Sequence, residues 1–249
     1  MNNLIRSELL KQRTIRVPLV AVAGMAFAGA LTAIALVTAA GHAGNPPLDR
    51  HSLTQLVHAP FAVVAGAALL LGILGTAGEF RHQTITSTLL VAPRRGRLLT
   101  AKVLVHAGLG AMLAVVACAA NVAVSIPWLS SHDVPLTGPA DLALGGGGVV
   151  AAAALFGATG AGLGALVANQ TAAVTVSLVW LLAVEGLVVT ITSTPTLHEF
   201  LPGGALGVIA RGTGEGAHTP LWAAAGCAVA YAGALVAAGT LRFTDRDVT

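Results

Sequence analysis

The sequence EFRHQTITSTLLVAPRRGRLLTAK, residues 79–102, is a charged and hydroxyl-rich interruption between two long apolar runs. In its middle, Thr84 and Thr86 are typical of a helix start and Pro93 of a helix end. Charged or titratable side chains flank this middle part: Glu79, Arg81, His82, Arg94, Arg95 and Arg97. We therefore predict a short helix that lies outside the apolar core and can contact another protein.

The composition places the two flanking runs in a membrane. Hydrophobic residues make up 55% of the chain and charged residues only 9%, whereas about a quarter of the residues in a soluble domain are charged. The mean hydropathy is +0.83. Apolar runs of about 18 residues or more recur, and each can cross a hydrocarbon core of roughly 30 Å as a helix. The sequence therefore predicts an all-α, polytopic integral membrane protein.

Six transmembrane helices are expected in a single domain over residues 1–249. The predicted spans are residues 17–40, 56–78, 98–126, 142–167, 171–193 and 219–241. Residues 41–55 and 127–141 are rich in proline and polar residues, and we predict loops there. The spans contain many alanine and glycine residues, which favours close helix packing through small side chains.

Two shorter segments accompany the spans. Residues 1–16 place leucine and isoleucine at helical spacing among four basic residues, which is typical of an amphipathic helix in the headgroup region. A solvated basic tail is the alternative. Residues 194–218 are moderately apolar but interrupted by Pro202-Gly203-Gly204, so they are too short to cross as one helix. A pair of short re-entrant helices fits this segment better.

Lysine and arginine predict the orientation, because short cytoplasmic loops are enriched in them. Of the 13 basic residues, only Arg50 and Arg211 lie outside the segments 1–16, 79–102 and 242–246. We therefore expect a multi-pass protein of the plasma (inner) membrane with both termini in the cytoplasm. The net charge of +3 follows from this distribution, so we expect no nucleic-acid partner.

The order of residues in 79–102 resembles a segment of ATP-binding-cassette (ABC) type-2 transporter permeases. That order is a carboxylate, a basic pair, a threonine-containing turn, an apolar helix, Pro-Arg-Arg and a lysine that begins the next span. In that family, the corresponding segment between spans two and three is the coupling helix that sits on the ATPase subunit. Gln83 stands where the family usually has glycine. The resemblance extends to the basic N-terminus, the spacing of the spans and Leu-Pro-Gly-Gly at 201–204.

The resemblance implies a role and partners for this chain. Residues 79–97 would form the coupling segment, with contacts from Glu79, Arg81, His82, Gln83, Thr84, Ile85, Thr86, Leu89, Pro93, Arg94, Arg95 and Arg97. Six spans would be half of a pore, so a second copy or a similar permease would pair with it. Two ABC ATPase subunits would bind ATP and Mg and drive export. The apolar character of the spans favours a hydrophobic or amphipathic cargo, such as a drug or lipid, in contact with membrane lipids.

The chain itself lacks signatures of catalysis. No G-x-x-x-x-G-K-[ST] sequence is present, and neither Lys11 nor Lys102 follows a glycine, so a P-loop is excluded. The eight histidines are scattered without a cysteine partner or an i, i+4 pair. We therefore expect no metal site, and no disulfide between Cys118 and Cys227, which both lie in apolar runs. Any ATPase activity would belong to a partner chain, and this chain would not be an enzyme.

Two polar residues inside the spans are candidates for a translocation path. Glu185 lies within VWLLAVEGLVV, where a carboxylate is costly unless it is protonated, paired or hydrated. It either lines the path or couples to protons, or it is a structural carboxylate near the end of its helix. Asn121 is the second candidate, with packing across helices as the other interpretation. The alternatives to an ABC exporter are a proton-coupled secondary transporter that uses Glu185 and a non-transporting membrane scaffold.

Overall fold

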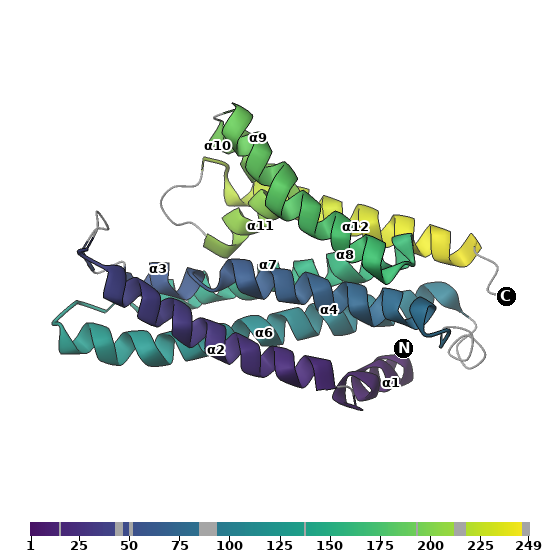
Figure 1. The fold of residues 1–249 in the computed structure, drawn as a ribbon, viewed down its shortest axis with the longest axis horizontal. Helices are drawn as coiled ribbons and strands as arrows, with labels where there is room; N and C mark the ends of the chain where they lie inside the picture. Colours follow the sequence, from purple (N-terminus) through teal and green to yellow (C-terminus); the bar gives the residue numbers. More distant parts are fainter. Residues whose placement is uncertain are drawn as a thin grey trace.

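The structure, a computed structural model, describes residues 1–14, 16–42, 47–49, 52–84, 94–136, 138–192, 194–211 and 218–245. Throughout these ranges the regular elements are helices (Figure 1). They are α1 (Asn2–Thr14), α2 (Arg16–Ala39), α3 (Ser52–His58), α4 (Phe61–Arg81), α6 (Arg95–Ser131), α7 (Pro139–Val167), α8 (Gln170–Leu178), η1 (Val179–Val184), α9 (Glu185–Thr192), α10 (Pro195–Glu199), α11 (Pro202–Arg211) and α12 (Leu221–Asp245).

Six helical segments of the described chain are long and apolar enough to cross a membrane. They are Arg16–Ala39, Ser52–Arg81, Arg95–Ser131, Pro139–Val167, Gln170–Thr192 and Leu221–Thr244. Each coincides with one of the six predicted spans. The helical fold class and the existence of six candidate membrane spans are therefore confirmed.

The two largest boundary differences occur in segments that contain a proline. The second segment begins earlier than expected, as α3, and continues as α4 after a break at Pro60, which has no backbone N–H to donate. The third segment, α6, continues through Pro127 to Ser131, although we predicted a loop from residue 127. A proline removes only its own donor, and apolar spanning helices tolerate this loss when their neighbours supply other contacts.

The fifth segment is not a uniform α-helix. Val179–Val184 forms a π-helical stretch between α8 and α9, and such bulges are rare and often occur at functional sites. Few of its side chains are buried, and Leu182 is 76% exposed. Figure 1 shows α9 inclined away from the other spans, whereas α8 packs against α4 and α7.

The densest packing lies where α7 meets α4 and α6. A Cβ atom added at Gly157 would collide with the backbone oxygen of His106, and one added at Gly160 would collide with that of Leu69. Gly72 on α4 would collide in the same way with Gly157. These glycines therefore permit direct backbone contact between helices, as the abundance of small residues predicted.

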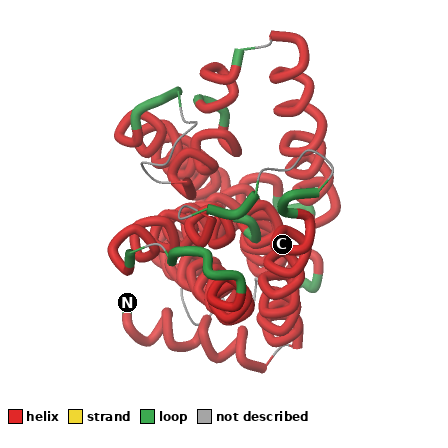
Figure 2. The backbone as a smooth tube through the Cα atoms, turned by 90° about the vertical axis from the view of Figure 1, so that its left-hand side faces the viewer, coloured by secondary structure: helices red, strands yellow, loops and turns green. Residues whose placement is uncertain are grey.

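One end of the bundle, which we call the terminal end, gathers segments that are far apart in the sequence. Figure 1 shows α1, the last turn of α4 and the end of α12 at this end. Leu98, Leu99, Ala165 and Phe243 form a small apolar core here. Figure 2 shows α1 lying crosswise to the bundle rather than along it. The predicted N-terminal helix is thus present, while its place at a membrane surface stays a prediction.

Candidate functional site

Four charged side chains meet at the terminal end, and we call them the ionic cluster: Glu8, Lys11, Glu79 and Lys102. The Lys102 Nζ atom lies 2.9 Å from Glu8 Oε2 and 2.6 Å from Glu79 Oε1. The Lys11 Nζ atom lies 2.8 Å from Glu8 Oε1 and 2.9 Å from the same Glu79 oxygen. Each lysine therefore bridges both carboxylates, and the cluster joins α1, α4 and α6.

Burial makes this cluster energetically demanding. The exposed fractions of Glu8 and Lys102 are only 1% and 2%, so both groups have lost their hydration and depend on their partners. Burial alone would raise the pKa of the Glu8 carboxyl, but Lys102 and Lys11 outweigh this effect and lower it. Burial likewise opposes the charged form of Lys11, yet hydrogen bonds to Glu8 and Glu79 raise its pKa. All four groups therefore belong to one charge-balanced unit.

Helical spacing brings these residues together. Glu8 and Lys11 are three residues apart and share one face of α1, as neighbours at this spacing do. Lys102 lies near the start of α6. One turn later, the Nδ1 atom of His106 lies 2.8 Å from the backbone oxygen of Lys102. The Nε2 atom of His106 also lies 3.5 Å from the side-chain nitrogen of Gln12 on α1. A partly buried polar contact between α1 and α6 therefore continues beyond the charged groups.

Sequence reasoning identified only part of the cluster. Glu79 was a predicted coupling residue, and Lys102 was part of the resembled motif, but neither Lys11 nor Lys102 was predicted to belong to a site. Glu8 and His106 were missed. The available signal was a single carboxylate in the otherwise basic segment 1–16, because one acid at helical spacing from a lysine favours an ion pair.

The predicted coupling residues fall into two groups. Ile85, Thr86, Leu89 and Pro93 lie outside the described residues. The structure places the others on either side, at the terminal end: Glu79, Arg81, His82, Gln83 and Thr84 before the gap, and Arg94, Arg95 and Arg97 after it. The guanidinium of Arg95 donates to the backbone oxygens of Phe243 and Thr244 at 3.0 and 3.2 Å. The beginning of α6 is thereby attached to the end of α12.

Gln83 has an unusual backbone conformation. Its φ is 54°, in the left-handed region that favours glycine. This is the position at which the resembled family usually has glycine. The turn after α4 thus has the geometry that a glycine would adopt with less strain, although the residue here is glutamine.

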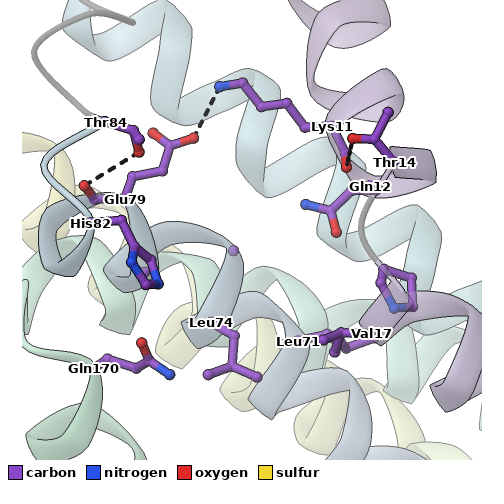
Figure 3. A pocket seen from close by; sticks show the side chains of 13 residues that line it. Lys11, Gln12, Thr14, Val17, Leu71, Leu74, Glu79, His82, Thr84 and Gln170 are labelled. Atoms are coloured by element: carbon purple, nitrogen blue, oxygen red, sulfur yellow. Dashed lines mark hydrogen bonds and ion pairs between the residues drawn. The ribbon is translucent and has the colours of Figure 1, made fainter.

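A cavity of about 610 Å³ borders the ionic cluster (Figure 3). Its polar walls include Lys11, Gln12, Glu79, His82 and Gln170, and its apolar walls include Val17, Pro18, Leu71 and Leu74. Figure 3 shows Glu79 and Lys11 facing each other on one side, with Val17, Leu71 and Leu74 together on the other. The cavity therefore has an amphipathic lining.

At the opposite end, Glu185 is bound by backbone donors. Its Oε1 atom accepts hydrogen bonds from Gly203 N at 2.8 Å and from Trp180 Nε1 at 2.9 Å. Its Oε2 atom accepts from Gly204 N at 3.1 Å and lies 3.5 Å from His198 Nε2. The carboxylate caps the start of α11, where backbone N–H groups lack helical partners. This is the geometry of a structural carboxylate; its role in a translocation path stays untested.

Glu199 makes a similar arrangement that the sequence did not reveal. Its two oxygens accept hydrogen bonds from His218 N, and its Oε2 also accepts from Thr219 N at 2.7 Å. Burial alone would raise the pKa of this carboxyl, but hydrogen bonds from His218 and Thr219 lower it. Glu199 therefore joins α10 to the chain just before α12.

Asn121 lies in a buried contact between spans. Its side-chain nitrogen donates to Gly29 O at 3.2 Å and to Thr32 Oγ1 at 3.3 Å, both on α2. Its oxygen accepts from Ser125 at 3.2 Å. With its side chain satisfied between α2 and α6, Asn121 acts as a packing contact in this structure.

The described residues contain no group of three or more His, Cys, Asp or Glu side chains that could hold a metal ion. Cys118 and Cys227 are both free thiols. Comparison with known proteins gives no further guide, since no protein-family model matches the chain and no curated protein is similar to it in sequence.

Proposed function

We propose that this chain is the membrane subunit of an ABC exporter, driven by ATP hydrolysis in a separate ATPase chain. The observation that carries the proposal is the arrangement of the terminal end. There, the residues before and after the predicted coupling helix stand beside the crosswise helix α1. A helix outside the membrane between spans two and three is well placed to receive a push from a partner.

The ionic cluster supplies a mechanical connection for this role. Glu79 lies in the last turn of α4 and Lys102 near the start of α6, so the two residues flank the predicted coupling segment. Glu8 and Lys11 on α1 bridge them. A displacement of the segment would therefore pull on α1, and through α1 on α2. Packed interfaces of this kind convert small shifts into discrete movements of helices.

The remaining parts of the proposal concern membrane placement, assembly and cargo. In the plasma membrane, the terminal end faces the cytoplasm, α1 lies at the surface, and α10 and α11 form the re-entrant pair. A second copy, or a similar permease, completes the pore and brings a second ATPase. The exposed apolar side chains of the fifth span suit either membrane lipid or such a partner. A hydrophobic or amphipathic cargo fits this setting.

The test is co-purification with the ATPase. Apolar side chains in the centre of a contact usually supply most of its affinity, whereas rim charges steer and align. Replacing both Ile85 and Leu89 with aspartate should therefore abolish co-purification. Arg94→Ala is the matched control from the same segment and should weaken it less. Unchanged co-purification of the double variant would reject the contact.

Orientation has its own check. A cysteine placed at Ser131, at the end of α6, should react with a membrane-impermeant reagent from outside the cell. A cysteine at Ser87 should react only after permeabilisation. Labelling of residue 87 from outside would place the proposed coupling segment on the wrong side of the membrane.

A further inference from the structure

The cavity at the terminal end has the size and lining of a ligand site, and it shares Glu79, His82 and Thr84 with the predicted coupling segment. Its volume of about 610 Å³ lies within the range of roughly 300–1,000 Å³ found for ligand pockets. One wall is apolar, and the opposite wall carries Lys11 and Glu79. A molecule with a polar head and a hydrocarbon part matches this division.

The carboxylate of Glu79 is only half satisfied. Its Oε1 atom accepts hydrogen bonds from Lys102 at 2.6 Å and from Lys11 at 2.9 Å. Its Oε2 atom is buried and accepts no hydrogen bond from any described residue, which is an unfavourable state for a charged acceptor. Figure 3 shows this second oxygen turned away from Lys11. Rotation about the last side-chain bond, which is a soft torsion in glutamate, turns both oxygens together. Oε2 is therefore presented to a donor in the cavity when the two flexible lysine side chains follow Oε1.

Lys11 offers the complementary group on the same wall. Its ammonium donates to Glu8 and to Glu79, and a lysine ammonium has three protons to donate. One proton therefore remains for an acceptor, and the side chain is 38% exposed. The wall thus presents a negative acceptor and a positive donor next to each other. Such a pair suits a zwitterion better than an anion or a cation.

We propose that this cavity binds an aminophospholipid through its phosphoethanolamine head. The primary ammonium of the head donates to Glu79 Oε2, and its phosphate accepts from Lys11. The hydrocarbon chains lie along Val17, Leu71 and Leu74. Val17 is 48% exposed at the start of α2, so the chains leave the cavity on the apolar outer surface of a span.

The proposal predicts discrimination between two zwitterionic lipids. Phosphatidylcholine carries the same charges but has no N–H to donate to Glu79, and charge-assisted hydrogen bonds are among the strong ones. In nanodiscs with equal amounts of the two lipids, the protein should retain phosphatidylethanolamine about tenfold more than phosphatidylcholine. Native mass spectrometry of the protein released from the nanodiscs measures how much of each lipid stays bound. Equal retention would overturn the proposal.

Two leucine variants on α4 test the location. A Cβ atom at Gly78 has only Gln170 Oε1 nearby, at 4.0 Å, so the side chain of Gly78→Leu enters the cavity. It should remove the tenfold preference. Gly66→Leu is the matched control, because a Cβ atom there meets nothing within 4 Å and Gly66 does not line the cavity. An unchanged preference in Gly78→Leu would overturn the proposal even if Gly66→Leu behaves as the wild type.

A third variant and a competitor complete the experiment. Glu79→Gln should lose most of the preference; if it fails to fold, the Gly78→Leu result decides. Soluble glycerophosphoethanolamine carries the same head without hydrocarbon chains. It should not displace the lipid, because the apolar wall contributes to binding. Displacement would overturn the lipid assignment and give the site to a soluble ligand.

Discussion

At the terminal end, Glu8 and Glu79 are neutralised by lysine side chains from other helices. At the opposite end, Glu185 and Glu199 accept most of their hydrogen bonds from backbone N–H groups, with Trp180 and Arg211 as side-chain partners. Both pairs of carboxylates occupy costly positions, yet their partners differ in kind. Lysine side chains are long and can follow or exchange partners when helices shift. Backbone N–H donors are fixed within their own helix or turn, so they hold a carboxylate in one position.

This difference suggests a division of labour along the bundle. The ionic cluster connects three helices that must move relative to one another if the chain is driven from the terminal end. The backbone-bound carboxylates fix α10 and α11 onto their neighbours. We therefore expect substitutions at the terminal end to uncouple helices, and substitutions at the opposite end to loosen short helices locally.

The largest effect is expected at Lys102. Lys102→Met leaves Glu8 and Glu79 with one lysine between them, and removal of one partner from a buried ion pair destabilises by about 3–5 kcal/mol. Chemical unfolding in detergent micelles measures this loss. Lys11→Ala is the comparison variant. Because Lys11 is 38% exposed, it should cost less than Lys102→Met, about 1–3 kcal/mol for the buried Glu8 oxygen that loses its partner.

A double variant separates pairing from simple packing. Glu8→Gln combined with Lys102→Met restores charge balance, since Glu79 and Lys11 remain. It should recover part of the stability that Lys102→Met loses. If the two single losses instead add up in the double variant, charge balance in the ionic cluster is not what holds α1.

A smaller and more local effect is expected at Glu185. Glu185→Leu leaves the backbone donors of Gly203 and Gly204 unpaired, at a cost of about 1–3 kcal/mol for each buried group. Glu185→Gln keeps an acceptor and should cost less. Amide hydrogen exchange over residues 203–206 should therefore accelerate in Glu185→Leu and change little in Glu185→Gln. Equal exchange in all three proteins would mean that Glu185 does not hold α11.

The smallest effect is the dependence of stability on pH. The pKa of Glu8 lies below its ordinary value of 4.5, so its contribution is present above pH 4.5 and is lost as pH falls through the lowered pKa. The pKa of Lys11 lies above 10.5, so its contribution is present below pH 10.5 and is lost as pH rises further. Between these limits the two contributions are constant.

Unfolding curves for wild type and Glu8→Gln measure the acid limb. The wild type should be the more stable protein at pH 7, and the difference should shrink below about pH 4.5 as Glu8 becomes protonated. A difference that grows with acidity would contradict the lowered pKa. Glu79, Lys102 and His106 face the same cluster, and both proteins contain them.

The spans were predictable because composition and hydrophobic length alone determine them. Each of the six coincides with an apolar run, and the break at Pro202 correctly separates α10 from α11. The continuation of α6 past Pro127 was not predictable in this way. It depends on contacts with neighbouring helices, which local propensity does not contain.

The candidate site was less accessible to sequence reasoning. Glu79 and Lys102 could be found because they interrupt apolar runs, but their partner Glu8 lies about 70 residues before Glu79 along the chain, a separation across which periodicity carries no information. For Glu185, the sequence could indicate only that the charge must be satisfied. The donors at Gly203 and Gly204 become visible only when α11 is placed against α9.

ATP-dependent efflux tests the proposed function most directly. The chain would be reconstituted into liposomes with the proposed ATPase partner, and release of a fluorescent amphipathic dye would be measured with ATP and a proton gradient supplied separately. We expect efflux with ATP alone, persistence of efflux in Glu185→Gln, and no efflux with an ATPase that cannot bind ATP. Efflux driven by the proton gradient alone and lost in Glu185→Gln would contradict the proposal and favour a proton-coupled carrier.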